Sequence, residues 1–274
     1  MNAISKLREL QLEEIEALKS LIDFCEQNGL TYYMRGGSVL GAVKYKGMIP
    51  WDDDIDIILP REDYNRLIKI APDNLGNAVF AHYSRNIKLN CYFARLYLDE
   101  RKRTEKNLPK NNANGLVLVD ILPIDGVPQD KLLRKLLELR VSILRLLASI
   151  HTLDHEDTVV KRNGFKKIIP EMLNKLRVHR MYEQTDIYNK LEKIYSNYMY
   201  STAIDVGVLA GSKYNKEVFP KIWLGSGELR EFENIQTRIP KQNDEYLKLL
   251  FGVDYMEREP DLSERVQKHF KGGI

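Results

Sequence analysis

Carboxylates and β-branched residues follow one another in Pro50-Trp51-Asp52-Asp53-Asp54-Ile55-Asp56-Ile57-Ile58-Leu59-Pro60. The flanking prolines disfavour a helix of useful length, and the isoleucines favour a strand over residues 54–59. Residues two apart on a strand share a face, so Asp54 and Asp56 project together while Ile55 and Ile57 point into the core. Because like charges repel at short range, two converging carboxylates at the end of a buried strand indicate a divalent cation.

Other acidic motifs fit this stretch less well. An EF-hand loop beginning at Asp52 needs glycine at its sixth position and glutamate at its twelfth, where the sequence has isoleucine and aspartate. A helical metal motif would use Asp52, Asp53 and Asp56, but the prolines on both sides leave such a helix too short. For Asp52 and Asp53, a solvated acidic loop or a helix cap remains an alternative interpretation.

A glycine turn precedes the acidic strand. Gly36, Gly37 and Ser38 open a short helix, and the first N–H groups of a helix together with a serine hydroxyl form a site for anions such as phosphate. Such a turn, followed by Asp-x-Asp on a strand and a third carboxylate on a neighbouring strand, is typical of the nucleotidyltransferase fold. Asp120 is the natural third carboxylate, because it is embedded in an apolar run and a buried Asp needs a partner.

The remaining pattern predicts an α+β fold, with a nucleotidyltransferase-like core in which helices flank a mixed sheet. We expect this core and a C-terminal extension in residues 1–128 and 201–274, and a helical insertion subdomain in residues 129–200, which are rich in Lys, Arg and Leu. Helices are predicted at 6–28, 61–70, 244–251 and 261–270, strands at 30–34, 54–59 and 116–122, a β-hairpin within 78–103 and a loop at 123–128.

Composition limits the function. Forty-two Lys and Arg residues balance 39 Asp and Glu residues, so no field strong enough for non-specific nucleic-acid binding is expected. Cys25 and Cys91 have no paired spacing, which predicts neither zinc nor disulfides and favours a reducing compartment. The charged N-terminus is not expected to be a signal peptide, and no apolar run is long enough to span a membrane, so we expect a cytoplasmic protein.

Several segments resemble the LicD family. That family comprises phosphotransferases that attach phosphocholine to bacterial surface glycans, with the fukutin-related proteins as distant relatives. One departure stands out, since the family commonly has Arg-His where this chain has Lys44-Tyr45. The similar segments are residues 36–43, 46–57, 60–64, 119–126, 217–220, 232–233, 246–247 and 251–256.

The resemblance implies a reaction as well as a fold. The enzyme would move phosphocholine from CDP-choline to a sugar hydroxyl of a teichoic-acid or lipopolysaccharide precursor, a lipid-linked glycan acceptor, and release CMP. Asp54, Asp56 and Asp120 would be the catalytic residues and would hold Mg²⁺, with Mn²⁺ as the alternative; one carboxylate, first of all Asp120, would accept the hydroxyl proton. Alternatives are another CDP-linked donor, CDP-ribitol or CDP-glycerol, and a catalytically inactive membrane-peripheral scaffold.

Further residues are candidates for binding this donor. Cations near the glycine turn and on an alternating strand could reach a diphosphate, and aromatic rings bind quaternary ammonium groups by cation–π contact. The nucleotide- and phosphate-binding candidates are Gly36, Gly37, Ser38, Arg35, Lys46 and Arg95; the choline candidates are Trp51, Tyr45, Tyr83 and Tyr92. Arg265 and His269 are C-terminal candidates, on a helix that would fold over the site.

Residues 131–147 are basic and leucine-rich. One interpretation is a helix that packs on its own core or on a partner subunit. The other is a face that docks on anionic lipid, which would place the protein peripherally at the inner face of the plasma membrane. The sequence does not indicate an oligomeric state.

Overall fold

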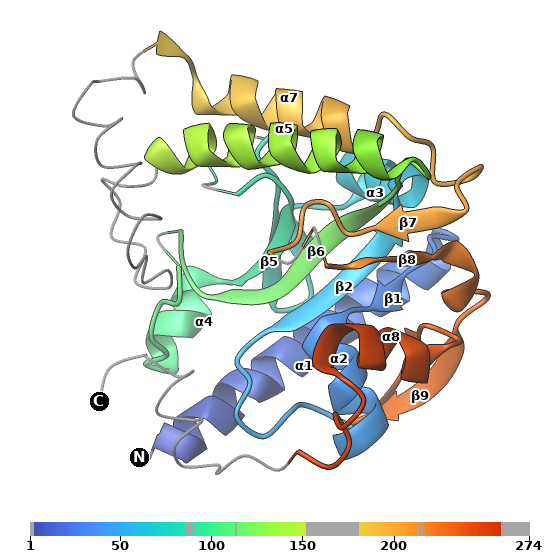
Figure 1. Ribbon diagram of the computed structural model, residues 1–274. Coiled ribbons are helices and arrows are strands. Elements are labelled where there is room, and N and C mark those ends of the chain that lie inside the picture. Colours follow the sequence, from blue (N-terminus) through green and yellow to red (C-terminus); the bar gives the residue numbers. More distant parts are fainter. Residues whose placement is uncertain are drawn as a thin grey trace.

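The computed structural model describes residues 3–85, 89, 91–112, 114–151, 181–212, 214 and 216–258. Within these residues, eight strands form one mixed sheet in the order β1-β2-β6-β5-β4-β3, with β7 paired to β6 and β8 to β7 (Figure 1). The expected mixed sheet flanked by helices is therefore confirmed. The strands are β1 Tyr33–Met34, β2 Ile55–Pro60, β3 Asn74–Leu75, β4 Ala78–Ala81, β5 Ala94–Leu98, β6 Val117–Gly126, β7 Asp205–Gly207 and β8 Val218–Pro220.

The two strands at the middle of the sheet, β2 and β6, are parallel, whereas the other pairs are antiparallel. On β2, Ile55 and Ile57 are fully buried and Asp56 is partly exposed, as the alternating pattern predicts. The predicted strand over 54–59 begins one residue later, so Asp54 lies just before the strand. The hairpin predicted within 78–103 is present as the antiparallel pair β4 and β5.

The loop predicted at residues 123–128 is wrong for its first four residues. β6 continues to Gly126, because Pro123 and Ile124 still pair with β2 while Asp125 and Gly126 pair with β7. A proline usually ends a strand, but here the partner strand lies some 80 residues further along the chain, beyond the reach of a local pattern. At the other side of the sheet, β1 is only two residues long, shorter than the run predicted at 30–34.

Helices pack around this sheet. In Figure 1, α5 and α7 lie side by side at one end of the molecule, while α1, α2 and α8 lie towards the other. The helices predicted at 6–28, 61–70 and 244–251 are confirmed, and the short helix after the glycine turn continues into a π-helical turn, Gly41–Tyr45. The helices are α1 Ala3–Gln27, α2 Gly36–Leu40, α3 Arg61–Ile70, α4 Glu100–Glu105, α5 Lys131–Ile150, α7 Gln184–Tyr195 and α8 Asn243–Phe251, with a 3₁₀ turn at Lys221–Trp223 and a separate hairpin of β9 Glu228–Phe232 and β10 Ile235–Ile239.

One hydrophobic core joins these elements. Leu18 of α1, Ile57 of β2 and Phe80 of β4 are fully buried in it, and so are Leu191 and Tyr195 of α7. The described helices of residues 129–200 thus pack on the same core as the sheet; the division into a core and an inserted subdomain stays a prediction. The helix predicted at 261–270 lies outside the described residues.

A buried ion cluster fastens α7 to the sheet. Arg61, the first residue of α3, donates two hydrogen bonds to Asp125 of β6 at 2.6 and 2.7 Å and also contacts Glu192 of α7. Asp125 is completely buried, and a buried carboxylate is stable only when it is paired in this way. No helix in the described part of the chain has the length and apolar composition needed to cross a bilayer.

Candidate active site

Three of the predicted site residues lie in a row across the middle of the sheet. Asp56 on β2 is the direct register partner of Asp120 on β6, and Asp120 is in turn the register partner of Arg95 on β5. Residues paired in this way present their side chains on the same face of a sheet. Asp54 precedes β2 and is exposed. The structure therefore brings Asp56, Asp120 and Arg95 together, with Asp54 two residues from Asp56.

Each of the two strand carboxylates is held by its own arginine. Arg35 donates from Nη1 to Asp56 Oδ2 at 2.8 Å, and Arg95 donates from Nε to Asp120 Oδ1 at 2.7 Å. From the sequence, both arginines are expected to contact a diphosphate. In this structure they instead neutralise the carboxylates, which is how a protein stabilises like charges brought close together.

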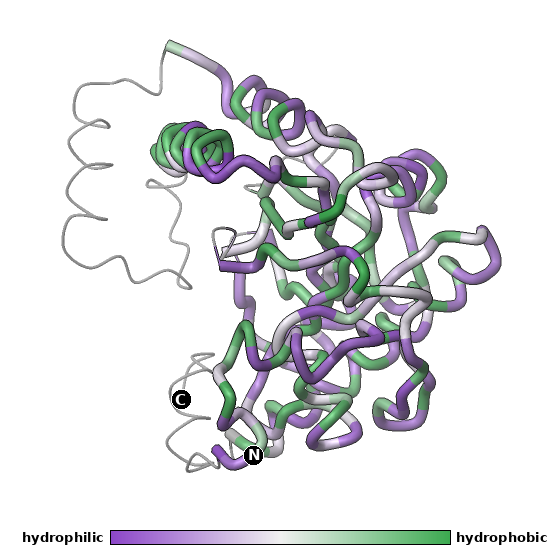
Figure 2. The backbone as a smooth tube through the Cα atoms, turned by 45° about the vertical axis from the view of Figure 1, so that its right-hand side comes forward, coloured by the Kyte–Doolittle hydropathy of each residue, from purple (hydrophilic) through white to green (hydrophobic). Residues whose placement is uncertain are grey.

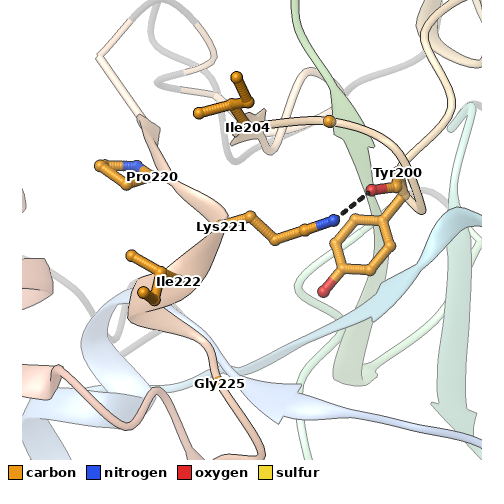
Figure 3. Close-up of a pocket in the computed structure, with 7 residues that line it drawn as sticks. Tyr200, Ile204, Pro220, Lys221, Ile222 and Gly225 are labelled. Carbon is orange, nitrogen blue, oxygen red and sulfur yellow. Dashed lines mark hydrogen bonds between the residues drawn. The ribbon is translucent and has the colours of Figure 1, made fainter.

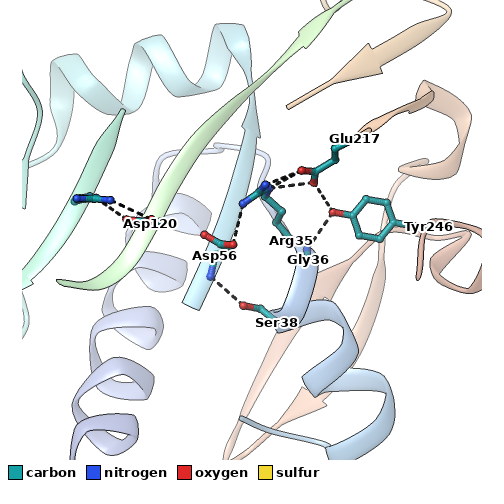
Figure 4. A network of polar contacts seen from close by, with 8 residues as sticks. Arg35, Gly36, Ser38, Asp56, Asp120, Glu217 and Tyr246 are labelled. Carbon is teal, nitrogen blue, oxygen red and sulfur yellow. Dashed lines mark hydrogen bonds and ion pairs between the residues drawn. The ribbon is translucent and has the colours of Figure 1, made fainter. Parts of the chain in front are cut away.

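Arg35 is also fixed from its other side (Figure 4). Its Nε and Nη2 donate to Glu217 at 3.0 and 2.6 Å, and Glu217 accepts a further hydrogen bond from the Tyr246 hydroxyl at 2.8 Å. Glu217 is only 1% exposed. Burial raises the pKa of Tyr246 well above its ordinary value, and the charge of Glu217 adds to this, so the phenol stays a hydrogen-bond donor. Glu217 and Tyr246 were not among the predicted site residues; their only signal was their place in family-like segments.

The same network holds the glycine turn. The Gly36 N–H donates to the Tyr246 hydroxyl at 3.0 Å, and Gly36 has a φ of +55°, a left-handed conformation that favours glycine. Ser38 accepts a hydrogen bond from the Asp56 N–H at 2.9 Å, which ties the turn to β2. A Cβ on Gly37 would lie 3.0 Å from Asp52, so glycine there lets that carboxylate approach closely. Anion binding by this turn remains a prediction.

A cavity of about 710 Å³ lies beside Asp56 and the glycine turn. The carboxyl-terminal end of α8 and the segment after it form part of its wall. It is lined by Arg35, Gly36, Gly37, Leu40, Lys44, Tyr45, Ile49, Trp51, Asp52, Asp56, Ser212, Glu217, Leu250, Phe251, Tyr255 and Arg258.

The four predicted choline-binding aromatics fall into two groups. Tyr45 and Trp51 line this cavity and meet edge to face, with ring centroids 5.9 Å apart. Tyr83 and Tyr92 do not line the cavity. Both pack against Tyr188 of α7, with ring centroids 5.2 and 5.8 Å from that of Tyr188. The structure thus separates the second pair from the first.

Other candidates lie elsewhere. Lys46 is exposed, 3.9 Å from Glu231, and does not line the cavity, whereas its neighbour Lys44 does. Arg265 and His269 lie outside the described residues. A second cavity, of about 550 Å³, lies around Tyr200 and Lys221, where Lys221 donates to the Tyr200 carbonyl (Figure 3). No carboxylate lines it, so the first cavity is the better candidate for the site.

Electrostatics distinguish the clustered aspartates from ordinary surface carboxylates. Burial, followed by the charges of Asp53 and Asp56, raises the pKa of Asp52 to about 7. Burial also raises the pKa of Asp56 to about 6, although Arg35 opposes the shift. Protein surrounds the exposed Asp54 closely enough that desolvation raises its pKa well above the ordinary value, and the charges of Asp52, Asp56 and Asp120 add to this.

These properties fit a divalent cation. Carboxylate oxygens are the ligands that Mg²⁺ and Mn²⁺ prefer, and a bound cation would relieve the repulsion that adds to the effect of burial on these pKa values. In the described part of the chain, no three His, Cys, Asp or Glu side chains are already gathered as a metal site. Asp56 and Asp120 turn their oxygens towards guanidinium groups instead.

Comparison with known proteins agrees with this geometry. Residues 29–116 match the family described as LicD/FKTN/FKRP, nucleotidyltransferase domain. This stretch is similar to the LicD family. The glycine turn, the acidic strand and Arg95 lie within the matched LicD region, whereas Asp120, Glu217 and Tyr246 follow it. The match confirms the resemblance to the LicD family that the sequence motifs indicate. It also confirms the expected nucleotidyltransferase-like core and the expectation of a transferase.

Similarity to one LicD protein extends over almost the whole chain. The lipopolysaccharide cholinephosphotransferase LicD of Haemophilus influenzae is 26% identical over 265 residues, which cover 94% of each chain. An uncharacterised Rickettsia prowazekii protein, RP689, is 35% identical over 31% of this chain and 32% of its own length. The mouse ribitol 5-phosphate transferase FKRP is 31% identical over 64 residues, which are 23% of this chain and 13% of FKRP.

Proposed function

We propose that this LicD-family transferase moves phosphocholine from CDP-choline to a sugar hydroxyl of a bacterial surface glycan precursor, teichoic acid or lipopolysaccharide, in a Mg²⁺-dependent reaction. The observation that carries the proposal is the row of Asp56 and Asp120 beside Asp54, with Asp56 also facing a cavity lined by cations and aromatic rings. Similarity over 94% of the length of a lipopolysaccharide cholinephosphotransferase supports the choice of substrate class.

The cavity offers complementary groups for each part of such a donor. The N–H groups of Arg35 that face neither Asp56 nor Glu217, and those of the glycine turn after Gly36, suit the diphosphate. Tyr45 and Trp51 suit a quaternary ammonium. Asp54, Asp56 and Asp120 would hold the Mg²⁺ or Mn²⁺, which when bound supplies neutralising charge for the diphosphate. Arg35 is already anchored by Glu217, so it can contact a phosphate with little loss of side-chain freedom.

The proposed step is an in-line substitution at phosphorus. The acceptor hydroxyl oxygen forms a bond to the phosphorus that bears choline, and the bond from that phosphorus to the bridging oxygen breaks, so that CMP leaves with its electron pair. The hydroxyl proton passes to a carboxylate, and Asp120 is the candidate, since Arg95 holds it in a fixed orientation. The free buried thiols of Cys25 and Cys91 suit a reducing compartment, in keeping with a cytoplasmic reaction.

A second candidate donor has its own support. Similarity to a ribitol 5-phosphate transferase makes CDP-ribitol, or the related CDP-glycerol, the alternative within the same site and the same chemistry. An inactive scaffold is less favoured, because a chain without catalysis would have no use for mutually repelling aspartates of raised pKa.

The test is donor-dependent CMP release by the full chain with Mg²⁺ and a membrane-derived glycan acceptor. We expect turnover with CDP-choline, and a loss of about a thousandfold in Asp56→Asn and Asp120→Asn. Asp73→Asn, which changes an exposed carboxylate away from the row, is the matched control and should keep full activity. Faster turnover with CDP-ribitol would select the alternative donor, and undiminished activity of the two row variants would refute the proposed site.

A further inference from the structure

Helix α5 is apolar on two opposite sides. Leu137, Val141 and Ala148 face the core and are buried. A second series faces outward at spacings of four, three and four residues, which places its members in line along the helix. The outward series is Leu132, Leu136, Leu139 and Ile143, with exposed fractions of 66%, 46%, 56% and 50%.

A helix normally buries each of its apolar sides, so the exposed second side of α5 calls for a partner. Single exposed leucines are common on protein surfaces, but four large apolar side chains in one line form a continuous patch, and such patches mark interaction sites. Figure 2 shows hydrophobic residues prevailing along α5, which lies at the outside of the molecule. We call this series the outer face of α5.

A groove between α5 and α7 adjoins the outer face. It encloses about 270 Å³, and its apolar lining includes Leu133, Leu136 and Ile194. Arg140 and Lys193 are exposed and line the same groove. An apolar floor with cations beside it matches a molecule that carries apolar chains below a negatively charged group.

The positive charge of α5 indicates which kind of partner its outer face binds. Helix α5 carries five Lys and Arg residues against one Glu. Two of the five are occupied within the protein: Arg134 pairs with Asp205, and Arg145 donates to backbone carbonyls. Among the described residues, no ion pair engages Lys131, Lys135 or Arg140. A second copy would bring an equally basic face against this one and be repelled, whereas an anionic lipid surface is complementary.

We propose that the outer face of α5, together with Lys131, Lys135, Arg140 and Lys193, docks on an anionic membrane surface. The leucines would enter the boundary between headgroups and acyl chains, with the helix axis in the membrane plane, and the cations would contact lipid phosphates. The binding uses no residue of the carboxylate row or its cavity. It would hold the site close to acceptors that are themselves attached to lipid.

The experiment is co-sedimentation of the full chain with vesicles of phosphatidylglycerol and phosphatidylcholine in equal amounts, compared with phosphatidylcholine alone. We expect binding to the anionic vesicles only, weakened by salt. The double variant Leu136→Ser/Ile143→Ser should bind about tenfold more weakly, because it removes apolar side chains that enter the lipid. The control Ile222→Ser/Leu229→Ser changes two apolar residues elsewhere that are more exposed than Leu136 and Ile143, and it should bind as the wild type does.

Thermal melting shows whether the α5 variant stays folded. We expect that it does, because Leu136 and Ile143 face outward. Three results would overturn the proposal. One is wild-type protein that stays in the supernatant with anionic vesicles. Another is equal vesicle binding by the α5 variant. The third is a dimer, measured by light scattering, that the same two substitutions dissociate, since the outer face would then be a protein interface.

Discussion

Asp56 and Asp120 are direct register partners on the parallel strands β2 and β6, yet their carboxylates do not share a partner. Arg35 holds the first and Arg95 the second. Two negative charges on adjacent strands are thus kept in place by two positive charges that come from opposite sides. Each carboxylate is paired without an added cation, but the two keep a mutual repulsion that a bound cation would relieve.

Removing the charge of Asp54, which lies beside this row, should stabilise the fold. In Asp54→Asn the side chain keeps its shape and loses the charge that is repelled by Asp52, Asp56 and Asp120. Without added metal, we expect a melting temperature about 3 °C above that of the wild type, together with loss of transfer activity. Differential scanning calorimetry measures the first effect. Asp23→Asn, an exposed carboxylate on α1, should leave the melting temperature unchanged, and an Asp54→Asn protein that melts earlier would contradict the prediction.

The raised pKa of Asp52 predicts how stability changes with pH. An aspartate titrates near 3.9 when unfolded and, for Asp52, near 7 when folded, so between these values the folded state binds more protons. Stability must then fall as pH rises through this window. In urea unfolding with EDTA, the wild type should lose stability relative to Asp52→Asn between about pH 4 and about pH 7, and the difference should level off above that. A difference that is constant with pH would rule out the raised pKa.

Glu217 should stabilise the folded protein through the network that it shares with Arg35 and Tyr246. Glu217→Gln removes the charge that faces Arg35 and should destabilise the protein by about 2–4 kcal/mol. Tyr246→Phe removes only the hydroxyl that joins Glu217 to Gly36 and should cost about 1 kcal/mol. Because the two side chains belong to one network, the double variant should lose less than the sum of the single losses. Additive losses in chemical denaturation would show that the network does not act as a unit.

The aromatic pair predicts selectivity for the donor. Replacing Tyr45 or Trp51 by leucine should weaken binding of CDP-choline about tenfold, and weaken CDP-ethanolamine less, because a quaternary ammonium depends more on ring faces. Isothermal titration calorimetry measures both. Tyr200→Leu, in the wall of the other cavity, is the control and should bind like the wild type. An equal loss for the two donors would leave no role for the rings in choline recognition.

Local patterns were sufficient for the elements that carry the site. Alternation of Asp and Ile predicted β2, the helices predicted at 61–70 and 244–251 are α3 and α8, and the embedded position of Asp120 predicted its place beside Asp56. The metal and choline assignments remain predictions. The sequence did not indicate which side chains from distant segments hold these carboxylates.

Two such relationships decide the site. Arg35 and Glu217 are 182 positions apart, and nothing near either residue indicates that they meet. Likewise, Tyr83 and Tyr92 could not be separated from Tyr45 and Trp51 by composition, because only the packing of α7 against them takes them out of the cavity wall. Ion pairs between distant segments depend on the topology of the fold, and the spacing of residues along the chain does not indicate that topology.

The hydrogen bond from the Gly36 N–H to the Tyr246 hydroxyl spans 210 positions of the chain. A ribosome produces Gly36, the acidic strand and Asp120 long before it produces Tyr246. Until the segment from Glu217 to Tyr246 has left the exit tunnel, Arg35 lacks Glu217 and the glycine turn lacks its phenol. A nascent chain therefore carries an incomplete centre, which is completed only after Tyr246 has been synthesised.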